Sequence, residues 1–242
     1  FDTPTAPLLL DLNVDGREIP AVVQATKQGW LYSFDRVTGE PIWPIVERPV
    51  PPSIVPGEVL SPTQPHVTWP EPYAMQGISE DDLVDFTPEL KAQALEAMED
   101  YVMGGLFNPP IHADNPDGKY AAMNCPGGAG GVNITSPPVA DPNTGMMYVN
   151  SHTACFALRL IPGEEADLLF PNSTGTTTAQ YANGVPGATA RPPRHPTGIP
   201  IWKPPYSTIT GYDMNTGEKR FEIPTGETPA RYAEVFEAAG AD

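Results

Sequence analysis

A short motif recurs in this chain, and each copy is flanked by segments with the composition of β-strands. The copies are residues 35–43 (DRVTGEPIW), residues 213–221 (DMNTGEKRF) and, in part, residues 141–145 (DPNTG). In each copy Asp and Thr side chains can bond back to turn amides, and the glycine can take a positive φ angle. A terminal aromatic can then pack on a neighbouring sheet. Such a repeat predicts successive four-stranded sheets, and hence a β-propeller.

Composition supports an all-β class. The 242 residues include 32 prolines and 22 glycines, and only 18% of residues are charged. Proline removes amide donors and glycine loosens helices, so extensive helix is disfavoured. Hydrophobic residues make up 40% of the chain, which is sufficient for a core. We therefore expect strands joined by long, rigid loops.

Strands are predicted at the two ends of the chain, with insertions between them. Residues 6–43 are predicted to form a four-stranded meander, whose fourth strand begins at "EPIW". Residues 44–124 form an inserted loop and helix region, in which the prolines exclude the interior of a sheet. Within it, residues 88–101 predict a helix that starts at a proline and has one apolar stripe. Residues 162–205 lack periodicity and predict a long irregular loop.

The formal net charge of −17 limits the kinds of molecule that the protein can bind. A surface this acidic repels phosphate backbones and anionic lipids, so nucleic acid is not an expected partner. The sequence contains no run of eighteen apolar residues, the length that a membrane-spanning helix needs.

Cysteines and histidines give no metal-site pattern. Cys125 and Cys155 match no zinc spacing, and they are compatible either with one disulfide or with two unpaired buried thiols. The four histidines are widely spaced, and we predict structural roles for them. They are His66, His112, His152 and His195. We predict no metal-ligand set within this chain.

Several ordered motifs resemble a known family. Residues 2–51 are similar over their whole length to the membrane-type glucose dehydrogenase branch of the quinoprotein dehydrogenases, which bind pyrroloquinoline quinone (PQQ). The resemblance continues through the runs "SPTQP", "FTPEL", "GLFNPP" and "GGAGGVN", and it returns at residues 207–224. It implies part of an eight-bladed propeller of four-stranded antiparallel sheets, with proline-rich and short helical insertions. In this family PQQ lies near the propeller axis with a calcium ion beside it.

The resemblance also implies an activity and a location. A sugar or alcohol hydroxyl loses its proton to an aspartate while hydride moves to the quinone, and electrons pass on to ubiquinone or a cytochrome. Proteins of this kind are periplasmic, and the resemblance allows attachment to the inner membrane through segments outside this chain. We expect the natural protein to be longer, with residues 1–242 supplying about three to four blades and no activity alone.

Three positions of the sequence match family site residues. Lys27 matches the lysine aimed at the quinone oxygens, where a cation is needed because negative charge develops there. Asn133 matches an asparagine that contacts the cofactor plane in a Gly-x-Asn-Trp motif, although Ile134 stands in place of the tryptophan. Asp2 matches the second aspartate of a Trp-Asp-x-Asp-x-Pro motif and is expected to be a structural neighbour. The base aspartate and the calcium ligands are then expected outside the chain.

Two other readings of the sequence stay open. One is a non-catalytic propeller that serves as a scaffold for protein assembly, which would have no reason to place the cation of Lys27 on the axis. The other is a family member that has lost the cofactor, for which Ile134 is the best support.

Overall fold

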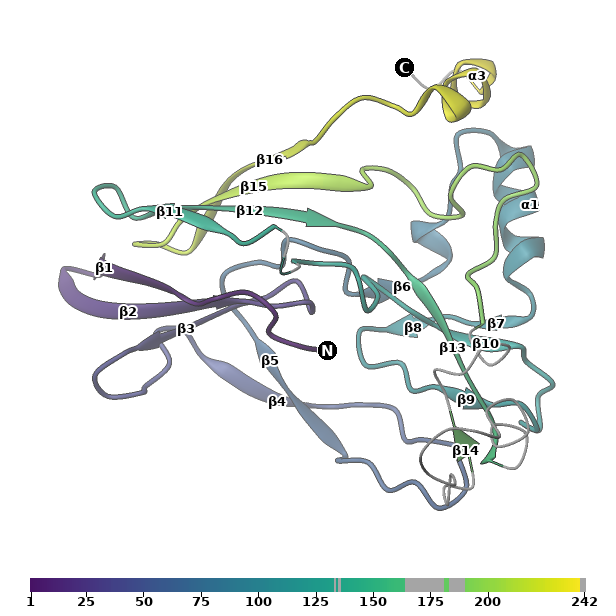
Figure 1. Cartoon of the computed structure of the whole chain (residues 1–242), viewed down its shortest axis with the longest axis horizontal. Coiled ribbons are helices and arrows are strands. Elements are labelled where there is room, and N and C mark those ends of the chain that lie inside the picture. The colour runs from purple at the N-terminus through teal and green to yellow at the C-terminus, as the bar shows by residue number, and fades with distance from the viewer. Residues whose placement is uncertain (133, 135, 164–180, 183–189, 240–242) are drawn as a thin grey trace, which may run out of the picture.

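The computed structural model describes residues 1–132, 134, 136–163, 181–182 and 190–239. The described part consists mainly of strands, in one three-stranded, one four-stranded, one five-stranded and two two-stranded sheets (Figure 1). No helix in this part is long and apolar enough to cross a membrane.

The first meander contains three antiparallel strands, in the order β1-β2-β3. They are β1 (Leu8–Val14), β2 (Arg17–Ala25) and β3 (Leu31–Asp35). Asp15 and Gly16 form the β1–β2 turn with φ angles of 53° and 76°, as hairpin turns of this kind require. Alternate residues of the strands are buried, so that one face of the sheet meets the core.

The predicted fourth strand of this meander is wrong. After β3 a single bridge joins Phe34 to Pro41, and the ladder ends there. The Asp35 amide donates to the Glu40 carbonyl and the Ile42 amide donates to the Ser33 carbonyl, both at 2.9 Å, and the described residues continue the pairing no further. The chain instead enters a separate hairpin of β4 (Ile45–Pro49) and β5 (Thr63–Val67). Its strands are largely exposed, consistent with the prediction that this segment stays out of a sheet interior.

The second meander has the four antiparallel strands expected of one unit. Its order is β11-β12-β15-β16, from β11 (Val139–Asp141) and β12 (Met146–His152) to β15 (Ser207–Asp213) and β16 (Glu218–Pro224). A long excursion separates β12 from β15 in sequence, yet the two strands pair along their full length.

The three copies of the motif fold into the same turn. In each, the aspartate Oδ1 accepts a bond from the amide two residues later, at 2.8–3.0 Å. The glycine amide then donates to the aspartate carbonyl at 2.7–2.9 Å, with a glycine φ between 74° and 78°. The threonine Oγ1 accepts from the amide two residues on. The sequence repeat is therefore a structural repeat.

The two meanders pack against each other through a shared apolar core. Figure 1 shows the four-stranded sheet beside the three-stranded sheet, with β11 close to β1. Both sheets contribute buried side chains to one cluster, among them Leu12, Val23 and Leu31 from the first and Met147, Val149 and Tyr212 from the second.

The terminal tryptophan of the first copy meets the turn of the second. A Cβ added to Gly217 would lie 3.1 Å from the Trp43 ring and 2.1 Å from Nε1 of Trp69. The Trp69 indole donates to the carbonyl of Thr216 at 2.8 Å. The terminal aromatic of the second copy behaves differently, because Phe221 lies over Gly211 of its own sheet. The expected docking on a neighbouring sheet is thus seen for Trp43.

The inserted region contributes short strands to a sheet that the sequence did not predict, and strands from beyond residue 124 complete it. The sheet order is β14-β13-β10-β7, and β9 also pairs with β13. Two of its pairings are parallel, β10 with β7 and β13 with β9, whereas antiparallel sheets were expected. Its strands are β7 (Tyr101–Val102), β9 (Ile111–His112), β10 (Ala121–Asn124), β13 (Phe156–Pro162) and β14 (Tyr181–Ala182). A two-residue pair, β6 (Gly77–Ile78) with β8 (Gly104–Gly105), lies nearby.

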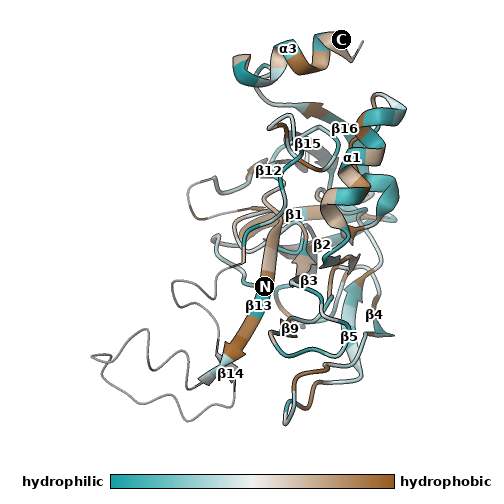
Figure 2. Cartoon of the chain, turned by 90° about the vertical axis from the view of Figure 1, so that its right-hand side faces the viewer, coloured by the Kyte–Doolittle hydropathy of each residue, from teal (hydrophilic) through white to brown (hydrophobic). Residues whose placement is uncertain are grey.

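The predicted helix is α1 (Pro88–Met98), three residues shorter than expected. Thr87 caps it, and its buried residues are Leu90, Ala94 and Met98, of which Ala94 and Met98 belong to a second core. In Figure 2 much of α1 has the colour of hydrophilic residues. A short 3₁₀ turn, η1 (Glu80–Asp82), precedes it.

Two features of the second half differ from expectation. Most of the predicted 162–205 loop lies outside the described residues, but its last part enters the second core through Ile199 and Ile201, both fully buried. A second helix, α3 (Ala230–Ala238), was not predicted, and its Phe236 packs edge-on against Phe86 at 5.3 Å between ring centroids.

Candidate functional site

Lys27 lies in the tight turn that joins β2 to β3. The Gly29 amide closes the turn on the carbonyl of Thr26 at 3.1 Å. Tyr73 stabilises this turn through two hydrogen bonds. Its hydroxyl accepts from the Thr26 amide at 2.8 Å and donates to the Thr26 carbonyl. Burial raises the pKa of the Tyr73 phenol, so it stays neutral and keeps its proton for that bond. The backbone beneath Lys27 is therefore held in one conformation.

The ammonium of Lys27 is paired with Asp2. Lys27 Nζ lies 2.8 Å from Asp2 Oδ2, and the Lys27 amide donates to the Asp2 carbonyl at 3.1 Å. The lysine side chain is only 15% exposed, whereas that of Asp2 is 69% exposed. The bond and the charge of Lys27 lower the pKa of the Asp2 carboxyl. The expected structural neighbour is thus the direct partner of the predicted site lysine.

A glycine loop, residues 126–132, lies directly on Lys27. Gly131 exchanges two backbone bonds with His152 at the end of β12, its amide donating at 2.9 Å and its carbonyl accepting at 3.3 Å. A Cβ on Gly131 would lie 2.7 Å from the Lys27 carbonyl oxygen, and its φ of 64° is one that L-residues rarely adopt. Only glycine fits here, because any side chain would push the loop away from Lys27.

The other predicted site residue, Asn133, lies outside the described residues. It follows Gly131 by two positions, and its neighbour Ile134 is 72% exposed. Within the described residues, no three His, Cys, Asp or Glu side chains gather closely enough to hold a metal ion.

The histidines occupy separate places in the structure. His152 belongs to the junction with the glycine loop. His66 packs against the rings of Trp30 and Phe107, at 5.1 and 5.3 Å between centroids. His195 is buried, and one of its ring nitrogens lies 3.1 Å from the carbonyl oxygen of Leu90.

Cys125 and Cys155 form a disulfide, which settles the alternative left open by the sequence. Sequence reasoning missed the contact of Gly131 with Lys27 and the support from Tyr73. The glycine density at residues 127–131 was a usable signal, since clustered glycines often mark a close backbone approach. Tyr73 had no comparable signal, because it is one tyrosine in a proline-rich segment.

The arrangement suits an anionic or electron-rich oxygen ligand. A partly shielded ammonium can stabilise negative charge on an oxygen brought to it, and the glycine loop leaves backbone rather than side chains around it.

Comparisons with known proteins bear on that ligand. The family model described as "Glucose/ethanol/alcohol dehydrogenase, beta-propeller domain", with the short name PQQ, matches residues 1–240. Quinate/shikimate dehydrogenase (quinone) of Acinetobacter baylyi is 30% identical over 93% of this chain and 28% of its own length. The glycerol dehydrogenase large subunit of Gluconobacter thailandicus is 30% identical over 90% of this chain and 30% of its own. Quinoprotein glucose dehydrogenase of Escherichia coli is 28% identical over 95% of this chain and 29% of its own length. The chain thus spans less than a third of each relative.

Proposed function

The chain belongs to the PQQ family of glucose, ethanol and alcohol dehydrogenase β-propellers, and on that premise we propose that the complete protein is a PQQ-dependent dehydrogenase. Its substrate is a sugar or alcohol hydroxyl, and its electrons pass to a quinone or a cytochrome. The names of the relatives support this class, since quinate, shikimate, glycerol and glucose all carry hydroxyl groups on carbon. The observation that carries the proposal is the largely shielded ammonium of Lys27 beside a loop that contacts its backbone at Gly131, where only glycine fits.

In this proposal Lys27 contacts the cofactor. Bound PQQ supplies the quinone that accepts the electrons of the substrate. Lys27 holds an ammonium group where negative charge develops on the quinone oxygens, which is worth most in a site that excludes water. Asp2 orients that ammonium through the 2.8 Å ion pair. Asn133, which follows the glycine loop, is the proposed second contact to the cofactor.

The remaining groups of the site are proposed to lie elsewhere in the complete protein. The base aspartate and the ligands of a calcium ion are assigned to segments outside this chain. The Cys125–Cys155 disulfide supports a periplasmic location, because disulfides persist in oxidising compartments. Attachment to the inner membrane would also depend on other segments.

The first test is cofactor binding and turnover in the complete protein. Loading with PQQ and calcium should give dye reduction with glucose, glycerol or quinate as the electron donor. Lys27→Ala should lower kcat by about 100-fold or more, because the stabilisation lost is that of a developing oxyanion. Lys203→Ala is the matched control, since Lys203 forms an ion pair with Asp85 away from this site. It should leave kcat unchanged.

Two outcomes would reject parts of the proposal. An unchanged kcat in the Lys27 variant would remove the role assigned to that lysine. If the wild-type protein bound no PQQ and reduced no dye with any donor, the enzyme assignment would be lost. The non-catalytic scaffold would then be the better account of the repeat.

A further inference from the structure

A disulfide stands at one end of the glycine loop, and Lys27 lies at the other. Resting on the function proposed above, we propose that the Cys125–Cys155 disulfide positions this loop for the cofactor. It acts through Gly131, which it keeps seated on the backbone of Lys27. The disulfide is thus a positioning device rather than a group that touches the reacting atoms.

A set of backbone contacts, called the ladder below, joins residues 152–156 to both ends of the loop. The β10–β13 pairing ends with Asn124 opposite Phe156. The disulfide comes next, and beyond it the Ala154 amide donates to the Pro126 carbonyl at 2.9 Å. The two bonds between Gly131 and His152 complete the series. The disulfide therefore lies at the boundary between the regular β10–β13 pairing and the irregular loop.

Val132, at the end of the loop, is fully buried in the first core, but residues 127–131 between the ends have little side-chain packing. A Cβ on Gly127 would lie 1.7 Å from the Ala154 carbonyl oxygen, and one on Gly130 would lie 1.8 Å from the Pro126 carbonyl oxygen. A Cβ on Gly128 would lie farther away, at 2.9 Å from the ring of Phe156. The approaches of Gly127 and Gly130 to backbone oxygens require glycine, and glycine loses more conformational freedom than other residues when a loop is ordered. A cross-link at the base of the loop reduces the freedom that must be lost.

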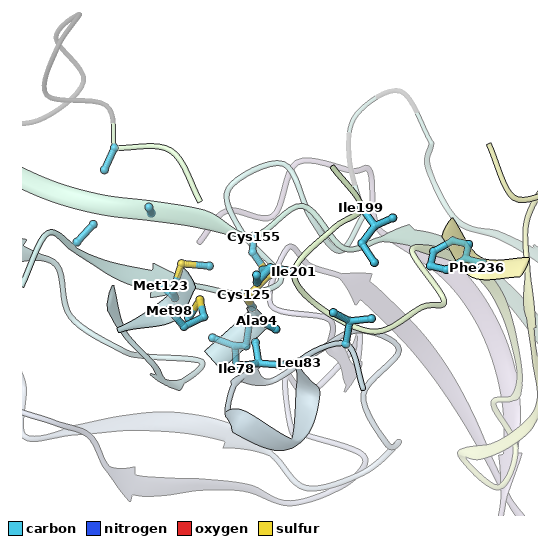
Figure 3. Close-up of a cluster of buried hydrophobic side chains, with 14 residues drawn as sticks. Ile78, Leu83, Ala94, Met98, Met123, Cys125, Cys155, Ile199, Ile201 and Phe236 are labelled. Carbon is cyan, nitrogen blue, oxygen red and sulfur yellow. A yellow bond between two sulfur atoms is a disulfide. The ribbon is translucent and has the colours of Figure 1, made fainter. Parts of the chain in front are cut away.

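The sulfur atoms are themselves firmly held. Cys125 is fully buried and Cys155 is 3% exposed, and both belong to the second core, with Met98, Met123 and Ile201 (Figure 3). The disulfide therefore ties the start of the loop covalently to β13, at a point that is buried on both sides. At the other end of the loop, Gly131 contacts the backbone of Lys27.

The test compares two variants of the complete protein. Cys125→Ala combined with Cys155→Ala removes the cross-link but keeps small apolar side chains in the core. Ile201→Ala truncates a fully buried member of the same core, so it lowers the Tm without touching the ladder. Variants are preferable to a reducing agent, because a reductant strong enough to cleave the disulfide would also reduce the quinone.

Two readouts are taken well below the Tm of both variants. Without cofactor, hydrogen exchange is followed at the amides of Gly131, His152 and Ala154, which form the ladder. With cofactor, the Kd of PQQ is measured by titration. We expect the double cysteine variant to exchange these amides at least about tenfold faster and to bind PQQ at least about tenfold more weakly. The Ile201 variant should resemble the wild type in both.

The outcomes separate this inference from the function on which it rests. Unchanged exchange and an unchanged Kd in the double variant would overturn the positioning role. So would equal effects in the Ile201 variant, since they would reflect general destabilisation of the core. A wild-type protein that binds no PQQ would remove the proposed function, and with it the cofactor part of this inference. The exchange data would still show whether the disulfide holds the loop.

Discussion

At the scale of single residues, Lys27 and Asp2 form an ion pair that the sequence did not predict. The resemblance to a family suggested Lys27 as a site residue, and that role stays a prediction. Asp2 was expected only to be a neighbour, because sequence cannot show which carboxylate meets a given ammonium across 25 residues. The structure brings their charged atoms within 2.8 Å. Asn133 remains a prediction, since it lies outside the described residues.

The pH dependence of this ion pair has a definite sign. Lys27 lowers the folded-state pKa of Asp2 below its ordinary value of 3.8. A carboxyl with a depressed pKa adds stability above its unfolded-state pKa, and that contribution is lost as the pH falls through the folded-state pKa. The Asp2 side chain is 69% exposed, so solvent screening keeps the contribution small. The titration of Asp2 is therefore a better readout than the Tm.

We predict that an NMR titration of the Asp2 carboxyl gives a pKa below 3.8 in the wild type. In Lys27→Ala the pKa should rise toward 3.8, because the hydrogen bond and the positive charge are both removed. Lys203→Ala should leave the Asp2 pKa at its wild-type value. An identical pKa in the wild type and the Lys27 variant would show that the ion pair does not form in solution.

At the scale of structural elements, the repeated turn was predictable because its determinants are local. Asp, Thr and Gly at fixed spacing specify hydrogen bonds within five residues, and all three copies make them. The missing fourth strand and the parallel pairings were not predictable in the same way. They depend on which distant segment meets β3, β10 or β13, and periodicity carries no information about partners. Helix α3 was missed because its only buried residue is Phe236, so it has no extended apolar stripe.

The turns of the first and second copies offer a matched pair of substitutions. Gly39 and Gly217 have φ angles of 78° and 75°, so alanine costs about 1–2 kcal/mol at either position for backbone reasons. At Gly39 an added Cβ meets nothing within 4 Å, whereas at Gly217 it meets Trp69 and Trp43. We predict that Gly217→Ala lowers the free energy of unfolding by about 1–3 kcal/mol more than Gly39→Ala does. Denaturant titration of the complete protein would measure the difference, and equal losses would contradict the docking contact.

At the scale of the whole molecule, the chain forms two packed meanders and matches only part of the length of its relatives. Its relatives are more than three times as long as the stretch it matches. The family match supports the propeller class, while the number of blades in residues 1–242 and in the complete protein stays a prediction.

We predict that residues 1–242 expressed alone reduce no dye with glucose, glycerol or quinate, even with PQQ and calcium added. The reason is that the base aspartate and the calcium ligands are assigned to other segments of the protein. The complete protein, assayed in parallel, should be active. Turnover by the isolated chain would contradict this prediction. It would show that the catalytic base is one of the carboxylates within residues 1–242.

The junction at Gly217 also provides an intrinsic fluorophore pair. Trp43 and Trp69 come from two different segments and converge on one glycine of the second meander, with the Trp69 indole bonded to a backbone carbonyl. Separation of the sheets would expose both indoles to water, and their emission would shift to longer wavelength. Fluorescence can therefore follow the opening of this contact without any added dye, provided that the signals of Trp30 and Trp202 are subtracted with single-tryptophan replacements.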